Sequence, residues 1–318
     1  MKIKSLLSFT VLAAALSGGS VPAFAGAAQA PAPLRILLVA GGCCHDYVNQ
    51  PAIMKKALEE RANVTVDIFT SGNNGVSTTH DLYKNPDWSK NYDLVIHDEC
   101  SADITDMAII NNILKPHLEG LPAVVLHCAM HSYRTAGWNA GGVTPWFEFT
   151  GLQSSAHGAQ LPIALNFFEK QNEITKGMAN WTTINEELYN NYAGGVLPTA
   201  RPLVYGKQGV DETVVVWTNI YKQKARVFGT TLGHNNGTVE DPRYLDLLTR
   251  GVLWAANKLN ANYLKPVPAA ATQKMSLLSA PISNEETALL QTQECGCHDA
   301  DNDDTSAASG EMTLALAN

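Results

Sequence analysis

The stretch Leu34–Gly42, which reads LRILLVAGG, decides the expected fold. It is a continuous apolar run that ends in two glycines, a pattern typical of a parallel strand buried on both faces of a sheet. The next segment, QPAIMKKALEER at 50–61, carries apolar side chains at helical spacing. A second apolar segment, VTVDIFT at 64–70, follows it. The order strand, helix, strand predicts the start of a layered α/β domain.

The alternation of strands and helices continues through the core. Further strands are predicted at 92–100, 122–132, 212–221 and 225–235, and further helices at 106–120 and 242–259. The last two of these strands look like a neighbouring pair. The whole pattern predicts an α/β fold whose central sheet is mostly parallel and flanked by helices. The sequence contains neither a GxGxxG dinucleotide fingerprint nor a P-loop.

Charge and composition limit the class of partner. The chain has 318 residues, 45% of them hydrophobic, which is enough for a sizeable core, and its formal net charge is −8. Lysine and arginine form no cluster beyond the first few residues. Nucleic-acid binding needs such basic patches, so a nucleic-acid partner is not expected. The oligomeric state stays open.

The first residues have the features of a secretion signal. Lys2 and Lys4 precede an apolar run at 6–16 that is too short to span a bilayer. Small residues permit cleavage after Ala25 or Ala30. We therefore expect a periplasmic or secreted mature protein without a membrane span.

The chain is expected to have three parts. Residues 1–25 are the predicted signal peptide, and residues 34–264 are the predicted domain. Residues 265–318 are acidic and of low complexity. Such a composition buries too little apolar surface to fold, so this part is predicted to be a disordered tail.

Six cysteines stand at positions 43, 44, 100, 128, 295 and 297. In an oxidising compartment cysteines form disulfides, but the spacing does not indicate which pairs form. A bond between Cys43 and Cys44 is not expected, because adjacent residues give a strained bridge. Cys295 and Cys297 lie in the predicted tail.

Polar side chains gather where predicted strands end. In open parallel sheets, ligands bind outside the carboxyl ends of the strands. Four predicted strands end in such residues, so we expect a shared pocket at this edge. The residues are Cys43, Cys44, His45 and Asp46; His97, Asp98, Glu99 and Cys100; His127, Cys128 and His131; and His234 and Asn235.

Three kinds of chemistry fit such a pocket. Cys128 stands where a nucleophile would, but Leu126 and Met130 replace the small residues of a sharp nucleophile turn. Imidazoles with carboxylates favour a divalent metal such as zinc, although no HExxH motif is present. General acid–base catalysis by histidine with a carboxylate needs the least special geometry.

Five segments of the core carry motifs of a known family. They are LLVAGGCCHDY at 37–47, YDLVIHDEC at 92–100, PAVVLHCAMHSYR at 122–134, EITKGMANWTTINEELYNNY at 173–192 and RVFGTTLGHNNGTVEDPRYLDLLTRGVLWAANKL at 226–259. In these segments the chain resembles the ThuA-like (trehalose utilisation) family. The resemblance implies a variant of the class I glutamine amidotransferase fold, a flavodoxin-like layered domain.

The resemblance also implies a function in carbohydrate catabolism. Proteins of this family are associated with oxidoreductases that make 3-keto-glycosides. This implies an enzyme, a hydrolase or lyase, that processes a keto-disaccharide or related carbohydrate by histidine-assisted elimination and hydration, with or without a divalent metal. Two alternatives stay open: a non-catalytic carbohydrate-binding module, and a Cys128-dependent amidotransferase-like hydrolase.

The strand ends and the resemblance together give the expected site. Catalytic roles are expected for His45, His127, His131, His234, Asp46 and Glu99, and the four histidines are also the expected ligands of a divalent metal. Substrate contacts are expected from Asp98, Glu187, Tyr189, Trp138, Trp181 and Asn235. For the two tryptophans, which fall in predicted loops, stacking on a sugar ring competes with ordinary packing.

Overall fold

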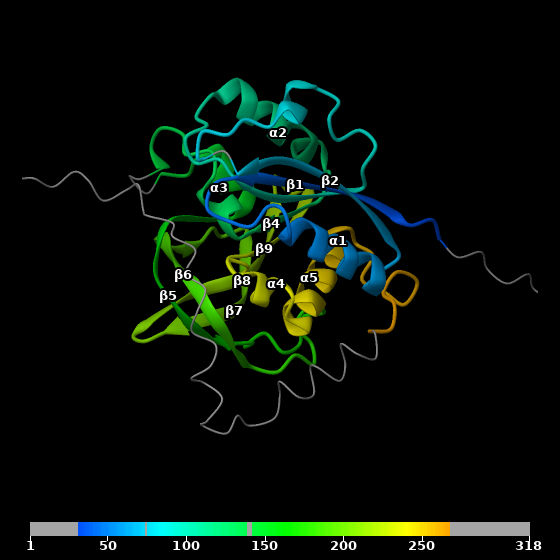
Figure 1. The fold of residues 1–318 in the computed structure, drawn as a ribbon, viewed down its shortest axis with the longest axis vertical. Coiled ribbons are helices and arrows are strands. Elements are labelled where there is room, and N and C mark those ends of the chain that lie inside the picture. The colour runs from blue at the N-terminus through cyan, green and yellow to red at the C-terminus, as the bar shows by residue number, and fades with distance from the viewer. Residues whose placement is uncertain (1–30, 74, 139–141, 268–318) are drawn as a thin grey trace, which may run out of the picture. The chain divides into compact units, whose positions relative to one another are not determined.

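Figure 1 shows the fold in a computed structural model, which describes residues 31–73, 75–138 and 142–267. The strands are β1 (Leu34–Gly42), β2 (Val64–Asn73), β3 (Leu94–Cys100), β4 (Ala123–Leu126), β5 (Leu152–Asn166), β6 (Trp181–Val196), β7 (Ala200–Gln208), β8 (Asp211–Tyr221) and β9 (Ala225–Thr230). The α-helices are α1 (Gln50–Arg61), α2 (Met107–Glu119), α3 (Pro145–Thr150), α4 (Asn236–Val239) and α5 (Pro242–Ala255), and the 3-10 helices are η1 (Asp81–Lys84) and η2 (His127–His131).

The strands form one sheet in the order β2-β1-β3-β4-β9-β8-β7-β5-β6. The strands β2, β1, β3, β4 and β9 pair parallel with one another. The pairs β9–β8, β8–β7, β7–β5 and β5–β6 are antiparallel. The α/β class is therefore confirmed, but the sheet is mixed rather than mostly parallel. The two halves differ in burial: β3 is buried throughout, whereas β5 is exposed over 158–162 and alternates between buried and exposed positions only over 163–166.

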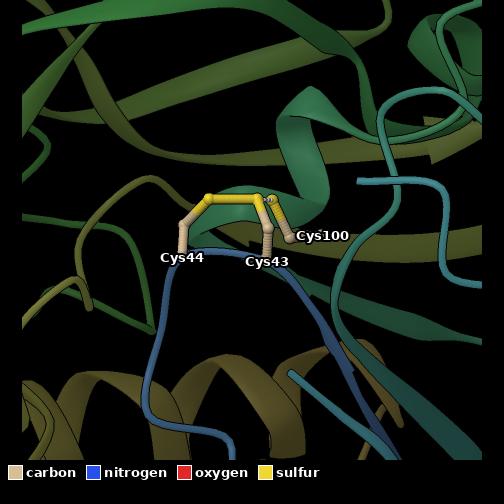
Figure 2. A group of neighbouring side chains, drawn as sticks. All are labelled: Cys43, Cys44 and Cys100. Carbon is tan, nitrogen blue, oxygen red and sulfur yellow. Dashed lines mark hydrogen bonds between the residues drawn. A yellow bond between two sulfur atoms is a disulfide. The ribbon is translucent and has the colours of Figure 1, made fainter. Parts of the chain in front are cut away.

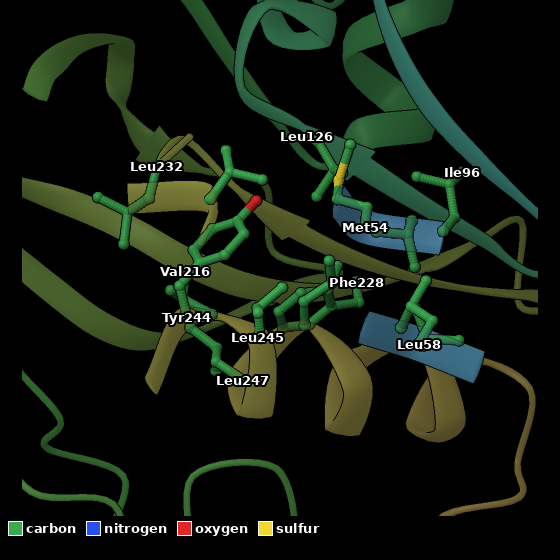
Figure 3. Packing of buried hydrophobic residues seen from close by; sticks show 14 of the residues in the cluster. Met54, Leu58, Ile96, Leu126, Val216, Phe228, Leu232, Tyr244, Leu245 and Leu247 are labelled. Atoms are coloured by element: carbon green, nitrogen blue, oxygen red, sulfur yellow. The ribbon is translucent and has the colours of Figure 1, made fainter. Parts of the chain in front are cut away.

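Helices cover both faces of the parallel half (Figure 1). On one face α1 and α5 bury Leu58 and Tyr244 against Leu126 and Phe228 of the sheet, and Figure 3 shows this packing. On the other face α2 and α3 contribute a second core. Each fully buried side chain of this size contributes about 1.5–3 kcal/mol to folding.

Helix α5 lies close against β9, the strand that leads into the site. A Cβ atom on Gly251 would lie 2.4 Å from a ring atom of Phe228, so only glycine permits this approach. The side chain of Asp241 caps the helix by accepting a hydrogen bond from the backbone N–H of Arg243, and Pro242 opens its first turn. These contacts fix the position of β9 and of the segment that follows it.

Some expectations concern parts of the chain outside the described residues. The predicted signal at 1–25 lies there, as do Cys295, Cys297 and nearly all of the predicted tail. In the part that is described, no helix is long and apolar enough to cross a membrane.

Candidate functional site

Three histidines from three separate strand ends meet at one edge of the sheet. His45 follows β1, His127 follows β4 and His234 follows β9. One ring nitrogen from each lies within 4.8 Å of the other two. The ring centroid of His45 lies 4.5 Å from that of His127 and 5.0 Å from that of His234. All three side chains are buried, so the edge forms an enclosed site.

Unusual backbone conformations place these histidines. Gly42 has a φ of +117°, and a Cβ atom there would lie 2.0 Å from the carbonyl oxygen of Cys100, so the path out of β1 requires glycine. Gly233 has a φ of +126°, and its Cβ would come 3.2 Å from the hydroxyl of Tyr244. His127 itself has a φ of 41°. For a residue other than glycine this costs about 1–3 kcal/mol, and such strain concentrates at functional sites.

A carboxylate from the antiparallel half completes the arrangement. Glu187 lies in β6, with its Oε2 3.3 Å from His127 Nε2 and its Oε1 3.0 Å from His234 Nδ1. Gln160 donates a hydrogen bond of 3.2 Å to the same Oε1. His45, His127, His234 and Glu187 are called the histidine cluster below.

The loop that carries His234 is held from two sides by buried polar side chains. Glu186 accepts hydrogen bonds of 3.1 Å from the backbone N–H groups of His234 and Asn235. Gln50 of α1 donates to carbonyl oxygens of the same loop, including that of His234 at 2.9 Å. Neither Glu186 nor Gln50 belongs to the expected site. The paired acids of the NEELYNN motif are the signal that points to Glu186.

His127 is oriented by a backbone carbonyl. Its Nδ1 lies 2.6 Å from the carbonyl oxygen of Thr231. Because a carbonyl oxygen only accepts, Nδ1 carries a proton and donates it, which leaves Nε2 to face Glu187. Metal-binding histidines are commonly held in this way through their second ring nitrogen.

Asp46 lies beside the histidine cluster but acts on its framework. Its carboxylate accepts hydrogen bonds from the backbone N–H of Asn49 at 3.1 Å and from the side chain of Asn236 at 2.7 Å. Partial desolvation raises the pKa of Asp46, but these hydrogen bonds bring it below its ordinary value. The structure therefore gives Asp46 the role of joining the His45 loop to α4.

Several buried polar atoms around the cluster have no hydrogen-bond partner within the described residues. They are His45 Nδ1, Tyr47 Oη, Asp98 Oδ2, His127 Nε2 and His234 Nδ1. The last two lie within ion-pair distance of Glu187, but in directions that make no hydrogen bond. An unpaired buried polar atom costs about 1–3 kcal/mol. Proteins keep such atoms where a water, an ion or a ligand supplies the partner, so this group of atoms around one edge makes the cluster the candidate binding site.

The cluster combines opposite charges with neutral groups. Burial raises the pKa of Glu187, but His127 and His234 lower it far below its usual range. Burial lowers the pKa of His127, but Glu187 brings it above its ordinary value. Burial and the two neighbouring histidines lower the pKa of His45 well below its ordinary value, and burial raises that of Asp98. These shifts favour the charged form of both Glu187 and His127 and the neutral form of His45.

The histidine cluster contains ligand types that suit a divalent cation. Three imidazoles and one carboxylate are typical of zinc and similar ions. Of the four expected histidine ligands, three converge, and His131 is not one of that group. Its ring stacks on Tyr189 with centroids 4.1 Å apart, and its Nε2 lies 2.9 Å from the hydroxyl of Ser154.

Tyr189 and His157 border the cluster on the side of the β5–β6 pair. The ring of Tyr189 lies 4.9 Å from that of His127, so the structure places Tyr189 next to the cluster. His157 Nε2 lies 3.5 Å from Glu187 Oε1, and its side chain is 25% exposed. The four side chains of the histidine cluster are buried, so His157 marks the point where the site approaches solvent.

Glu99 lies on the opposite face of the sheet from Asp98, because successive residues of a strand point to opposite faces. Its Oε1 accepts hydrogen bonds from the hydroxyls of Tyr83 at 2.9 Å and Tyr133 at 3.0 Å, and lies 2.9 Å from His97 Nδ1. The structure therefore separates Glu99 from the histidine cluster, and a catalytic role there does not fit its position.

A chain of hydrogen bonds extends from this carboxylate. His97 Nε2 lies 3.1 Å from His117 Nε2, and His117 Nδ1 lies 2.7 Å from the carbonyl oxygen of Leu121. All of these side chains are buried. The set of Tyr83, His97, Glu99, His117 and Tyr133 is called the Glu99 network below.

The two tryptophans expected at the substrate lie apart from the cluster. Trp181 begins β6, six residues before Glu187, which is about 20 Å along an extended strand. The guanidinium of Arg243 lies 4.2 Å from the Trp181 ring centroid. Trp138 packs against Arg134, whose guanidinium carbon lies 4.5 Å from its ring centroid, beside a surface hollow.

The cysteines of the core are paired in two disulfides. Cys100 is bonded to Cys128, so in this oxidised state Cys128 has no thiolate and cannot act as a nucleophile. Cys43 is bonded to Cys44, which corrects the expectation that these neighbours do not pair. Cys44 has a φ of 78°, and this left-handed conformation brings the adjacent side chains to the same side.

Comparison with known proteins gives a family and a fold. The family model described as ThuA, trehalose utilisation, matches residues 35–255. Among curated proteins, no sequence matches significantly.

Two solved structures share the fold. A protein described as ThuA-like from Parabacteroides merdae is 20% identical, with a TM-score of 0.59, over 74% of this chain and 94% of its own. Another from Bacteroides uniformis is 16% identical, with a TM-score of 0.55, over 72% of this chain and 94% of its own. A glutamine amidotransferase from Thermotoga maritima is 9% identical, with a TM-score of 0.41, over 77% of this chain and 94% of its own. The first two likenesses show the fold alone, and the third is too distant to carry an argument.

Proposed function

Because the chain belongs to the ThuA family of trehalose utilisation, we propose that it is an enzyme that cleaves a 3-keto-glycoside, such as a keto-disaccharide, at the histidine cluster. The reaction is an elimination followed by hydration. The observation that supports this site is the convergence of three histidines among buried polar atoms that lack partners within the described residues, with Glu187 within ion-pair distance of two of them. The family supports the class of substrate, and the cluster offers groups for proton transfer.

The proposed chemistry starts at the carbon next to the ketone. A carbonyl at C3 acidifies the hydrogen at C2, and His45, whose Nδ1 is unpaired among the described residues, removes it as the base. The electron pair forms an enediolate, and His127 stabilises its negative oxygen. The C1–O bond then breaks with its electron pair, and Asp98 protonates the leaving oxygen. Water adds to the C1–C2 double bond, with its hydroxyl on C1 and its proton on C2.

The same residues fit a divalent cation. His45, His127, His234 and Glu187 would hold it, and it would supply Lewis-acid stabilisation of the enediolate. With His45 held in this way, the carboxylate form of Asp98 would be the group placed to accept the proton from C2. Glu186 and Gln50 keep His234 in place in both cases.

The test is turnover of a 3-keto-disaccharide by the purified protein, before and after treatment with a chelator. We expect release of the two monosaccharide units by the wild type. His127→Gln should lower kcat by about 10²–10⁴-fold. Loss of activity with the chelator and its return with Zn²⁺ identify the metal-assisted form, whereas full activity after metal removal identifies the metal-free form.

The matched control is His117→Gln, a second buried histidine, which lies in the Glu99 network. Its kcat and KM should equal those of the wild type for the folded fraction of the protein. Absence of turnover on keto-glycosides, with equal sugar binding by the wild type and His127→Gln, would refute the proposal. That outcome would support the non-catalytic carbohydrate-binding alternative instead.

We also propose that the mature protein works in the periplasm or outside the cell. The signal-like residues at 1–25 support this, and so do the Cys43–Cys44 and Cys100–Cys128 disulfides, which persist in oxidising compartments. Recovery of the full-length chain from the cytosol, with Met1 still attached, would contradict it.

A further inference from the structure

We propose that Cys43, Cys44, Cys100 and Cys128 form a thiol–disulfide exchange site. It accepts two electrons from an external dithiol at Cys44 and ends with a free thiol at Cys128. This inference concerns four sulfur atoms that the sugar chemistry does not use, and it does not depend on the proposed function.

The geometry brings the two disulfides into contact. Strands β1 and β3 pair so that Gly42 lies opposite Cys100, and the backbone N–H of Cys43 donates a hydrogen bond of 3.2 Å to the carbonyl oxygen of Cys100. The Sγ atoms of Cys43 and Cys100 are 3.4 Å apart (Figure 2). Both atoms are oxidised here and carry no proton, so this is a contact between sulfur atoms of different disulfides.

Burial gives the exchange a direction. Cys44 is partly exposed, whereas Cys43, Cys100 and Cys128 are 9%, 2% and 6% exposed. An external thiolate therefore reaches Cys44 first. It forms a mixed disulfide with Cys44, and Cys43 leaves as a thiolate beside Cys100.

The second step is an internal exchange. The Cys43 thiolate attacks Cys100, the Cys43–Cys100 bond forms, and the Cys100–Cys128 bond breaks with its electron pair going to Cys128. The second thiol of the reductant resolves the mixed disulfide at Cys44. The reductant becomes a disulfide and loses two hydrogens, which appear on Cys44 and Cys128, so atoms and electrons balance.

The product thiol has a chemical consequence. Ligand atoms of His45, Cys100 and Cys128 lie within 4.8 Å of one another. Exchange therefore releases the Cys128 thiol at the border of the histidine cluster, where the oxidised protein has no free thiol. The substrate class is a dithiol, either a small molecule or a protein with a reduced cysteine pair.

The test uses a background in which Cys295 and Cys297 are replaced by serine, so that only the four core cysteines report. The protein is treated anaerobically with one equivalent of dithiothreitol, alkylated rapidly, and mapped by mass spectrometry without reduction. We expect label on Cys44 and Cys128 together with a Cys43–Cys100 linked peptide. Label on Cys43 and Cys44 with an intact Cys100–Cys128 bond would overturn the proposal.

Single substitutions in the same background locate the exchange without a reductant. In Cys44→Ser, Cys43 starts as the free thiol. It should attack the Cys100–Cys128 bond, so the alkylation label should appear on Cys128 and not on Cys43. In the matched Cys43→Ser variant the label should stay on Cys44, because the sulfur next to Cys100 is missing. Label that remains on Cys43 in Cys44→Ser contradicts the internal step. The reductant experiment stands independently of how well either variant folds.

Discussion

The protein buries two sets of histidines with a glutamate, one at the edge of the sheet and one under its α2 face, and the two sets are satisfied differently. In the Glu99 network, hydrogen bonds run from Glu99 through His97 and His117 to a backbone carbonyl. In the histidine cluster, a nitrogen of each histidine lacks a hydrogen-bond partner within the described residues. Glu99 Oε2 is also unpaired among the described residues, so the two sets differ in their ring nitrogens. Both nitrogens of His97 and of His117 have partners, whereas each histidine of the cluster keeps one without a partner in the described part of the chain.

The largest expected effect comes from Glu187→Gln, which removes the charge of the histidine cluster and keeps the shape. The carboxylate raises the pKa of His127 and so favours its protonated form, and its loss should lower kcat on a keto-disaccharide by about 10²–10⁴-fold. Steady-state kinetics measure this, with circular dichroism to verify the fold. Turnover equal to that of the wild type would show that the cluster is not the reactive set.

The same substitution in the other set, Glu99→Gln, should act on stability. It breaks a buried pair with His97 and weakens two hydroxyl contacts, which costs about 3–5 kcal/mol of unfolding free energy. Denaturant unfolding measures the loss. The kcat of the folded fraction should not change, and a fall in kcat without a loss of stability would reverse the roles of the two sets.

The pH dependence of stability should come partly from His117. Burial lowers its pKa from 6.5 to about 3. Between these values the unfolded chain binds a proton that the folded protein does not, so the unfolding free energy falls as the pH falls, by up to about 1.4 kcal/mol per pH unit. His117→Gln should remove this contribution. Denaturant midpoints at pH 7 and pH 5 compare the two proteins, and an equal slope in both would contradict the assignment.

The smallest effect is expected from Trp181→Leu. Trp181 shares β6 with Glu187 but lies far along the strand, against Arg243. The substitution should cost about 0.5–1 kcal/mol of stability through the lost cation–π contact, with kcat and KM unchanged. A raised KM for the sugar would place Trp181 at the substrate after all.

Much of the parallel half could be predicted from the sequence. The run at Leu34–Gly42 and the strand ends at His45, His127 and His234 are visible because a strand buried on both faces has no polar residue until it ends. The convergence of these ends follows from parallel pairing. The antiparallel half is harder to predict, since β5 carries a run of exposed residues at 158–162, and such a run also suits a loop.

The composition of the site beyond the strand ends was less accessible to prediction. Asp98 and Glu99 are adjacent and equally acidic, and only the alternation of β3 decides which one faces the histidines. Gln50 acts through a contact with a loop that lies 184 residues away in sequence, and no local pattern signals it. The Cys43–Cys44 bond depends on the backbone angle of Cys44, which spacing does not reveal.

The adjacency of Glu186 and Glu187 on β6 links two events. Glu186 holds the backbone of the His234 loop, and Glu187 faces the histidine rings. Local unfolding of the β5–β6 pair would release both contacts in one step. The complete site therefore exists only as long as β5 and β6 remain paired. Amide hydrogens of His234 and Asn235 should exchange with solvent at the same rate as those of β6.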